Sequence, residues 1–107
     1  MSRSILFVDD EPSILGIYEM LQPFLGEDYF VSTAPGGQEG LKLLDERSYD
    51  IVVSDLTMPN MNGIEFLDRI MRLRPMPVIM VSSLTTSGGD ATIRALVIGA
   101  VDFVANP

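Results

Sequence analysis

The feature of this sequence that most limits its fold is a set of short, uninterrupted apolar runs. Residues 5–8, 51–53 and 78–81 consist only of isoleucine, leucine, valine, phenylalanine and methionine. Runs of this length and composition are typical of strands that are buried on both faces, as in a parallel sheet. The sequence therefore predicts a parallel sheet that helices must cover on both sides.

Segments of helical periodicity separate these runs. Apolar side chains recur at helical spacing from residue 14 to about 25, after Pro12, which suits the first turn of a helix. Further helices are predicted over about 36–46, 64–73 and 93–97, and further strands over 29–32 and 101–105. Strands that alternate with helices imply a parallel sheet with right-handed crossovers. The predicted fold class is therefore α/β.

Three aspartates follow two of the apolar runs. Asp9 and Asp10 come after the first run, and Asp55 follows the run at 51–53. If both strands belong to one parallel sheet, the three carboxylates converge at its carboxyl edge, where open α/β sheets bind ligands. Three acids crowded there repel one another and are costly to desolvate, and a hard divalent cation such as magnesium resolves that conflict. The alternative is that each acid is a solvated residue at a strand end or helix start.

The charge and composition of the chain exclude several functions. It has 107 residues, which fits one small domain, and a formal net charge of −8. Such a surface repels nucleic-acid phosphates, so direct nucleic-acid binding is not expected. The chain contains no histidine and no cysteine, which rules out an imidazole base, disulfides and thiolate metal sites. Any chemistry must therefore use carboxylates, hydroxyls, backbone amides and a metal.

Nothing in the sequence indicates a membrane segment or an export signal. The longest apolar runs span only a few residues, whereas about 20 are needed to cross a bilayer as a helix. The first four residues lead directly into a strand without a signal-peptide pattern. We therefore expect a cytoplasmic protein.

The stretch at 57–63, after the third aspartate, is rich in turn-forming residues. Pro59 and the Asn62-Gly63 pair bend the chain sharply, and Gly63 tolerates dihedral angles that other residues avoid. Such a turn could aim the backbone carbonyl of Thr57 at a cation. An ordinary loop between a strand and a helix is the alternative.

Ser82 and Ser83 end the run at 78–81, at the same predicted edge of the sheet. A hydroxyl there could hydrogen-bond a phosphoryl oxygen on Asp55. Taken alone, a serine that merely ends a strand is the simpler interpretation. Phe103, on the predicted strand at 101–105, is most simply a core residue.

Motifs along the whole chain closely resemble the receiver domain of two-component response regulators. They lie in the family's order and spacing at 8–12 (Val-Asp-Asp-Glu-Pro), 54–59 (Ser-Asp-Leu-Thr-Met-Pro) with Gly63, 80–83 (Met-Val-Ser-Ser) and 99–103 (Gly-Ala-Val-Asp-Phe). The resemblance implies a doubly wound, flavodoxin-like sheet of five strands in the order 2-1-3-4-5. It also implies a single receiver domain over 1–107.

The second half of the chain is most similar to the regulatory domain of the chemotaxis protein-glutamate methylesterase. The similarity runs from 69 to 103 and is strongest at 71–77 and 81–85. The first half resembles receivers in general. Any attached output enzyme, such as a methylesterase, would lie outside this chain, which is expected to be a phosphoacceptor signalling domain and not an enzyme.

The resemblance assigns a role to each of the three aspartates. It implies that Asp55 is the phosphoacceptor and takes a phosphoryl group from a sensor histidine kinase or a small phosphodonor. It implies that Asp10, Asp55 and the carbonyl of Thr57 hold magnesium, with Asp9 helping through water.

The resemblance also implies a switch beside the phosphoacceptor. Ser82 would move to meet the phosphoryl oxygen, and the aromatic side chain of Phe103 would swing inward with it. Such a pair is a bistable element that new charge can bias.

Two departures from the family pattern concern the end of the chain. Where the family has a Lys-Pro pair, this sequence has Asn106-Pro107, and asparagine offers a neutral donor in place of a full positive charge. The family's fifth helix does not follow, so we expect a domain truncated at its C-terminal end. The sheet face beside the first helix would then be covered by a second copy in a homodimer or by exchange of a strand and helix, or the monomer would be marginally stable. An output domain or protein is the expected signalling partner.

Three functions remain open from the sequence. The first is a magnesium-dependent phosphoacceptor switch at Asp55, and the second is a receiver-fold interaction module whose switching is weakened by Asn106. The third, a phosphatase with an aspartyl nucleophile, is disfavoured because Thr57 stands where that class needs a second acid. The first is the leading hypothesis.

Overall fold

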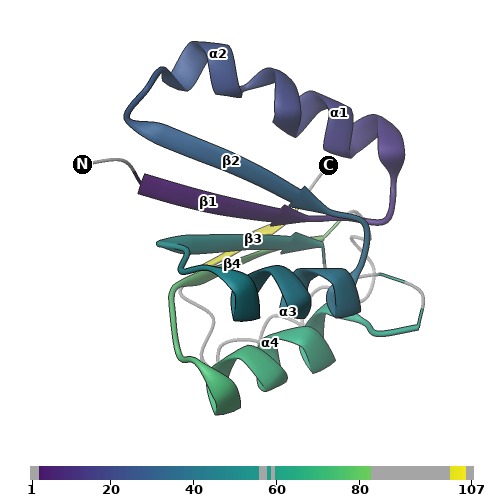
Figure 1. The fold of residues 1–107 in the computed structure, drawn as a ribbon. Coiled ribbons are helices and arrows are strands. Elements are labelled where there is room, and N and C mark those ends of the chain that lie inside the picture. The colour runs from purple at the N-terminus through teal and green to yellow at the C-terminus, as the bar shows by residue number, and fades with distance from the viewer. Residues whose placement is uncertain (1–2, 56–57, 59, 83–101, 106–107) are drawn as a thin grey trace.

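All five predicted strands pair into one parallel sheet. The computed structural model of the chain describes residues 3–55, 58, 60–82 and 102–105 (Figure 1). The strands are β1 (Arg3–Val8), β2 (Tyr29–Ala34), β3 (Ile51–Asp55), β4 (Val78–Ser82) and β5 (Asp102–Ala105). Every neighbouring pair is parallel, and the order is β2-β1-β3-β4-β5. The predicted α/β class and strand order are confirmed.

Helices cover both faces of this sheet. They are α1 (Pro12–Met20), α2 (Gln22–Leu25), α3 (Gly37–Glu46) and α4 (Gly63–Leu73). α1 and α2 lie on one face, and α3 and α4 lie on the other (Figure 1). The helix predicted over 93–97 falls outside the described residues. Within the described ranges, no helix combines the length and the apolar character needed to span a membrane.

The helix predicted from Pro12 to about residue 25 is divided in two, which the periodicity did not indicate. α1 ends at Met20 and α2 begins at Gln22. Pro23 explains the break, because proline has no N–H to donate and its ring clashes with the carbonyl four residues earlier. Gly26 then ends α2 with a φ of 77°, a left-handed conformation that favours glycine.

The sharp turn before α4 depends on Asn60, whereas the sequence had indicated Gly63. Within the described part of the chain, Asn60 is the one non-glycine residue with a positive φ, 68°. Asparagine tolerates this conformation better than most residues do. Gly63 instead begins α4, and the side-chain oxygen of Asn62 caps that helix by accepting a hydrogen bond from the Glu65 N–H at 2.8 Å.

The core lies between the sheet and the layer formed by α3 and α4. Its large apolar side chains that are at most 1% exposed come from β1, β3, β4 and α4: Leu6, Val8, Val52, Phe66, Leu67, Ile70, Val78 and Met80. Gly40 allows α3 to approach this layer closely, since a Cβ at that position would lie 2.9 Å from Cζ of Phe66. The α3–α4 face is therefore tightly packed.

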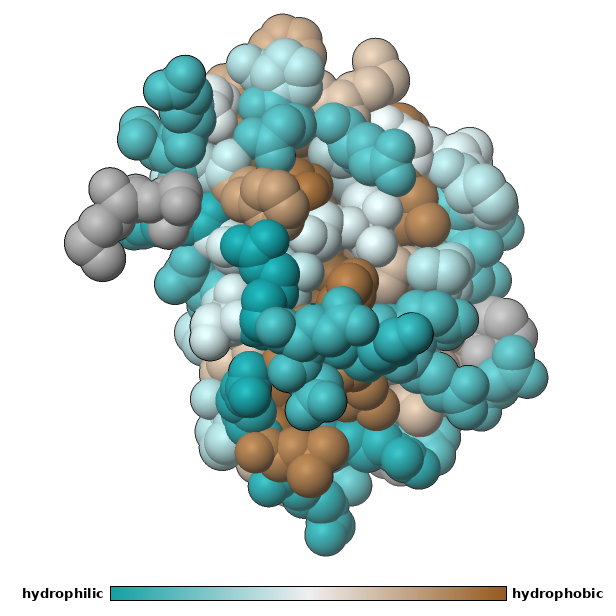
Figure 2. Space-filling view, in the orientation of Figure 1, coloured by the Kyte–Doolittle hydropathy of each residue, from teal (hydrophilic) through white to brown (hydrophobic). Residues whose placement is uncertain are grey.

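The opposite face is packed much less tightly. In the described structure, α1 buries none of its residues. Ile17 is 55% exposed, Met20 68% and Phe24 85%. Apolar surface accordingly appears at the top of Figure 2, over the α1–α2 layer. The two faces of one sheet thus differ strongly in burial.

Candidate metal centre

Asp9, Asp10 and Asp55 lie together at the carboxyl edge of the sheet. β1 and β3 are adjacent and parallel, with Val8 opposite Ser54, so the next residues, Asp9 and Asp55, lie side by side. One carboxylate oxygen of each aspartate lies within 4.8 Å of those of the other two. Sequence positions far apart therefore form one acidic cluster because their strands are neighbours.

Asp9 is the most buried member of the cluster. It is 9% exposed, and burial raises its pKa above the ordinary value of 3.8, with a further upward contribution from the negative charge of Asp10. Backbone N–H groups of Glu11 and Asp10 act in the opposite direction, and the Glu11 N–H donates to Oδ1 of Asp9 at 2.9 Å. The ionised cluster is thus under electrostatic stress that a cation would relieve.

The three carboxylates fit a magnesium ion. Ligand oxygens on an octahedron with Mg–O distances of about 2.1 Å are about 3.0 Å apart when adjacent and about 4.2 Å apart when opposite. The separations within the cluster, up to 4.8 Å, therefore need only small side-chain movements. All three donors are hard carboxylate oxygens, the class that magnesium prefers.

The other predicted site residues are described only in part. The backbone of Ser82 ends β4 one residue beyond Val81, which pairs with Asp55, so Ser82 lies at the same edge as the cluster. The backbone of Phe103 lies opposite Met80, two residues before that edge. The side chains of Ser82 and Phe103, and all of Thr57 and Asn106, fall outside what the structure describes.

A pocket of about 520 Å³ opens beside the acidic cluster. Asp9, Glu11 and Asp55 supply its charged lining. The remaining described lining comes from α1 and β4 and consists of Ile14, Ile17, Tyr18 and Val81. The cluster therefore opens onto the loosely packed α1 face and not onto the tight α3–α4 core.

Tyr18 is a site residue that the sequence did not single out. In the helical pattern it counts as one apolar position among several aliphatic ones. The structure stacks its ring on Phe7 of β1, with centroids 4.1 Å apart and planes 15° from parallel. The available signal was the hydroxyl itself, because a tyrosine on an otherwise apolar stripe needs a polar neighbour or solvent for its O–H.

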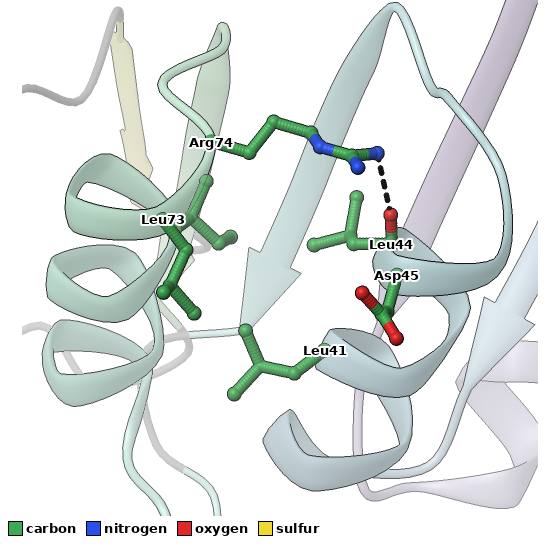
Figure 3. A pocket seen from close by; sticks show the side chains of 6 residues that line it. Leu41, Leu44, Asp45, Leu73 and Arg74 are labelled. Carbon is green, nitrogen blue, oxygen red and sulfur yellow. Dashed lines mark hydrogen bonds between the residues drawn. The ribbon is translucent and has the colours of Figure 1, made fainter.

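A second pocket, of about 210 Å³, lies between the C-terminal ends of α3 and α4 (Figure 3). Leu41, Leu44, Ile70 and Leu73 line it together with one acid and one base, Asp45 and Arg74. The Arg74 guanidinium donates to the Leu44 carbonyl at 2.8 Å. This bond gives a partner to a carbonyl in the last turn of α3, where helical carbonyls lack one. Arg74 thus joins the two helices, and the described lining holds no cluster of reactive groups.

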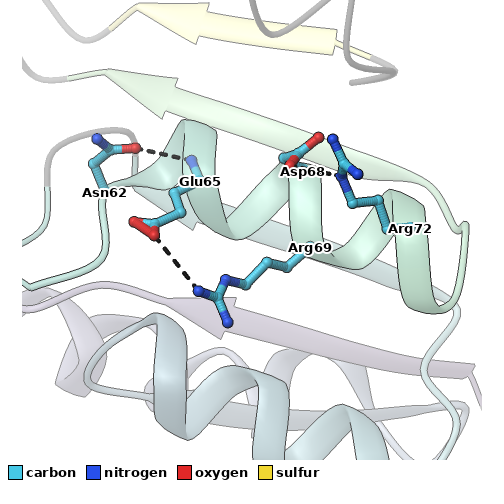
Figure 4. A network of polar contacts seen from close by, with 5 residues as sticks. All are labelled: Asn62, Glu65, Asp68, Arg69 and Arg72. Atoms are coloured by element: carbon cyan, nitrogen blue, oxygen red, sulfur yellow. Dashed lines mark hydrogen bonds and ion pairs between the residues drawn. The ribbon is translucent and has the colours of Figure 1, made fainter.

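Exposed ion pairs run along α4, beyond its Asn62 cap (Figure 4). Glu65 lies 3.7 Å from Arg69, and Asp68 lies 2.9 Å from Arg72. Pairs of this kind contribute about 0.3–0.5 kcal/mol each. They support the helix that follows the loop after Asp55 and do not belong to the acidic cluster.

Comparison with known sequences agrees with this geometry. The profile of the response regulator receiver domain matches residues 5–107. A protein-glutamate methylesterase/protein-glutamine glutaminase from Agrobacterium fabrum is 47% identical over 103 residues, which cover 96% of this chain and 29% of that protein. Protein-glutamate methylesterase/protein-glutamine glutaminase 1 from Dechloromonas aromatica is 41% identical over the same number of residues and with the same coverage. The chain thus spans about three tenths of the length of these relatives.

Solved structures show the same fold. The response regulator domain of Thermotoga maritima CheB superposes with a TM-score of 0.87 at 39% identity and covers 100% of this chain and 80% of its own. A CheY-like receiver domain protein from Methanospirillum hungatei superposes with a TM-score of 0.89 at 30% identity, covering 100% of this chain and 83% of its own.

Proposed function

The chain belongs to the response regulator receiver domain family, and from that premise we propose that it is a phosphoacceptor switch centred on Asp55. The observation that carries the proposal is the convergence of Asp9, Asp10 and Asp55, with carboxylate oxygens within 4.8 Å of one another. Asp55 ends β3 and lines the open pocket, so a phosphodonor can reach it. Asp9 is more deeply buried and better suited to hold a cation.

In the proposed reaction a carboxylate oxygen of Asp55 attacks the phosphorus of the donor. The new bond joins that oxygen to phosphorus, and the bond to the donor's leaving group breaks. The leaving group is the imidazole nitrogen of a sensor histidine kinase or the carboxylate of acetyl phosphate. The product is an acyl phosphate on Asp55.

Asp10, Asp55 and the Thr57 carbonyl are the proposed magnesium ligands, and Asp9 is proposed to help hold the ion through water. When bound, magnesium would offset the negative charge that the carboxylates and the phosphoryl oxygens bring together. The raised pKa of Asp9 supports this assignment, because its carboxylate is costly to ionise in the metal-free site.

The proposed output is a change in the carboxyl edge of β4 and β5. The Ser82 hydroxyl would bind a phosphoryl oxygen, and Phe103 would follow it inward. The names of the relatives suggest the wider role, in which a longer protein carries a protein-glutamate methylesterase that this receiver controls in chemotaxis. The kinase, the output enzyme and the cytoplasmic location are parts of this proposal.

A second candidate is an interaction module with the same fold and weak switching. Asn106 in place of the family's lysine favours it, because a neutral amide replaces a full positive charge near the phosphoryl group. This candidate predicts that the phosphorylated and unphosphorylated forms bind every partner equally.

Mass spectrometry after incubation with magnesium and acetyl phosphate tests the proposal directly. We expect one added phosphoryl group on the wild-type chain and none on Asp55→Asn or in the presence of a chelator. An unmodified wild-type chain, or an adduct that survives Asp55→Asn, would rule out Asp55 as the phosphoacceptor. Asp50→Asn is a matched control, since Asp50 accepts a hydrogen bond from the Ser4 N–H at the opposite edge of the sheet.

A further inference from the structure

Tyr18 holds a fixed position between α1 and the sheet. Its ring stacks on Phe7 at 4.1 Å, so rotation of the side chain is restricted. Phe7 is itself 8% exposed, which anchors the pair on β1, the strand that leads into Asp9. The tyrosine hydroxyl is therefore presented from a rigid support.

The hydroxyl of Tyr18 lies in the electrostatic field of the acidic cluster. Burial raises the pKa of Tyr18 above its ordinary value of 10.0, and the negative charges of Asp9 and Asp55 raise it further. Tyr18 also lines the same pocket as both acids. A tyrosine phenol is protonated at neutral pH in any case, so Tyr18 offers this pocket a hydrogen-bond donor.

The Tyr18 hydroxyl differs from the other described side chains of the pocket, because it can donate a hydrogen bond. The described lining offers only acceptors from Asp9, Glu11 and Asp55 and only hydrocarbon from Ile14, Ile17 and Val81. At neutral pH, Tyr18 thus carries the one side-chain hydrogen-bond donor among the described lining residues. A phosphoryl group adds three strong acceptor oxygens and further negative charge. Among the described lining side chains, only Tyr18 can donate a hydrogen bond to such a group.

We propose that the Tyr18 hydroxyl donates a hydrogen bond to a phosphoryl oxygen carried by Asp55, which makes Tyr18 a phosphoryl-binding residue of this receiver. The inference rests on the proposed function of Asp55 and adds a contact from the α1 side of the pocket. It gives the tyrosine a role that packing alone would not require, because phenylalanine would stack on Phe7 equally well.

Tyr18→Phe tests the proposal, because it removes the hydroxyl and keeps the ring stack. With acetyl phosphate and magnesium, we expect the rate of phosphoryl incorporation to fall at least about tenfold, because one hydrogen bond to a charged group is lost. Tyr29→Phe, at the start of β2, is the matched control and should react at the wild-type rate. Thermal unfolding of both variants checks that the fold is retained.

A second readout reports the contact without any turnover. The chain has three tyrosines and no tryptophan, so its near-ultraviolet absorbance comes mainly from tyrosine. Beryllium fluoride with magnesium mimics a phosphoryl group on an aspartate. We expect it to perturb the tyrosine spectrum of the wild type and of Tyr29→Phe, and to leave that of Tyr18→Phe unchanged.

The outcomes separate the inference from the proposed function. Wild-type uptake of a phosphoryl group on Asp55, with an equal rate and an equal spectral change in Tyr18→Phe, overturns the role of Tyr18 and leaves the phosphoacceptor intact. A wild-type chain that takes up no phosphoryl group overturns both.

Discussion

The two faces of the sheet differ in how deeply their helices bury apolar side chains. On the α3–α4 face, Phe66 and Leu67 are 0% exposed and Ile70 is 1% exposed. On the α1–α2 face, Ile17 and Phe24 keep 55% and 85% of their surface. Since burying a large apolar side chain contributes about 1.5–3 kcal/mol, the first face supplies most of the stability of the described fold.

This difference in burial assigns stability to the α3–α4 face and the proposed chemistry to the α1–α2 face. The pocket beside Asp9 and Asp55 opens on the loosely packed face, where Tyr18 can present a hydroxyl without disturbing the core. The core beneath α3 and α4 is less suited to a phosphoryl group, because its central side chains are apolar and at most 1% exposed, and burying a charged group among them is costly. Substitutions should therefore unfold the chain from one face and alter its function from the other.

The largest expected contrast is between two phenylalanines. Phe66→Ala should lower the free energy of unfolding by about 3–5 kcal/mol, because it leaves a cavity in the core. Phe24→Ala should change it by less than about 0.5 kcal/mol, because that ring is mostly solvated. Urea denaturation measures both. Equal losses would mean that the α1–α2 face is buried in solution.

Two glycines provide the next contrast, with opposite signs. Gly40→Ala should cost about 1–3 kcal/mol, because its Cβ would lie 2.9 Å from Phe66 and 3.2 Å from Val8. Gly16→Ala, inside α1 with no atom within 4 Å of the new Cβ, should add about 0.5–1 kcal/mol. The same denaturation assay applies, and a loss at Gly16 would show that α1 is packed after all.

Asp9 should link stability to pH. Its pKa is raised in the folded state, so its contribution to stability is full below pH 3.8 and is lost as the pH rises through the folded-state pKa. Asp9→Asn should therefore stabilise the metal-free chain at pH 7, by up to about 1 kcal/mol, and the gain should vanish in acid. Melting curves from pH 3 to 8 measure this.

Bound magnesium should offset the loss of stability that the Asp9 carboxylate causes in the metal-free chain at pH 7. At ten times its dissociation constant, the ion should stabilise the wild type by about 1.4 kcal/mol through mass action. It should stabilise Asp9→Asn less, because one donor has lost its charge. An equal magnesium effect on both proteins would remove Asp9 from the proposed magnesium site.

The smallest expected effect concerns association of two copies through the α1–α2 face. The net charge of −8 opposes it, so added salt should strengthen any dimer by screening. Phe24→Ser should then weaken the dimer about two- to fivefold, whereas Leu73→Ser, 77% exposed on α4, should not. Sedimentation equilibrium distinguishes the two, and equal effects would exclude a dimer through this face.

The strands were predictable because their signal is local. Uninterrupted runs such as 5–8 and 78–81 report burial on both faces without any knowledge of their neighbours. The break between α1 and α2 was equally local, at Pro23, yet the regular apolar spacing across it concealed it. The turn at Asn60 was concealed in the same way by the stronger glycine signal at Gly63.

The site was predictable only in part, because a side chain's chemistry depends on what lies beside it. The three aspartates could be grouped from the sequence, since strand ends in a parallel sheet share one edge. Tyr18 could not be joined to them, because its periodicity describes a face of a helix and not the strand on which that face packs. The roles of Thr57, Ser82, Phe103 and Asn106 stay predictions.

The sequence by itself determined the α/β class, the positions of the strands and the acids at their ends, because hydrophobic periodicity and strand polarity are properties of a single segment. The tertiary structure alone decided that the α1 face stays open, that the pocket meets the acidic cluster there, and that Tyr18 stacks on Phe7 beside it. Those facts depend on the distances between segments, which packing sets and no single segment encodes.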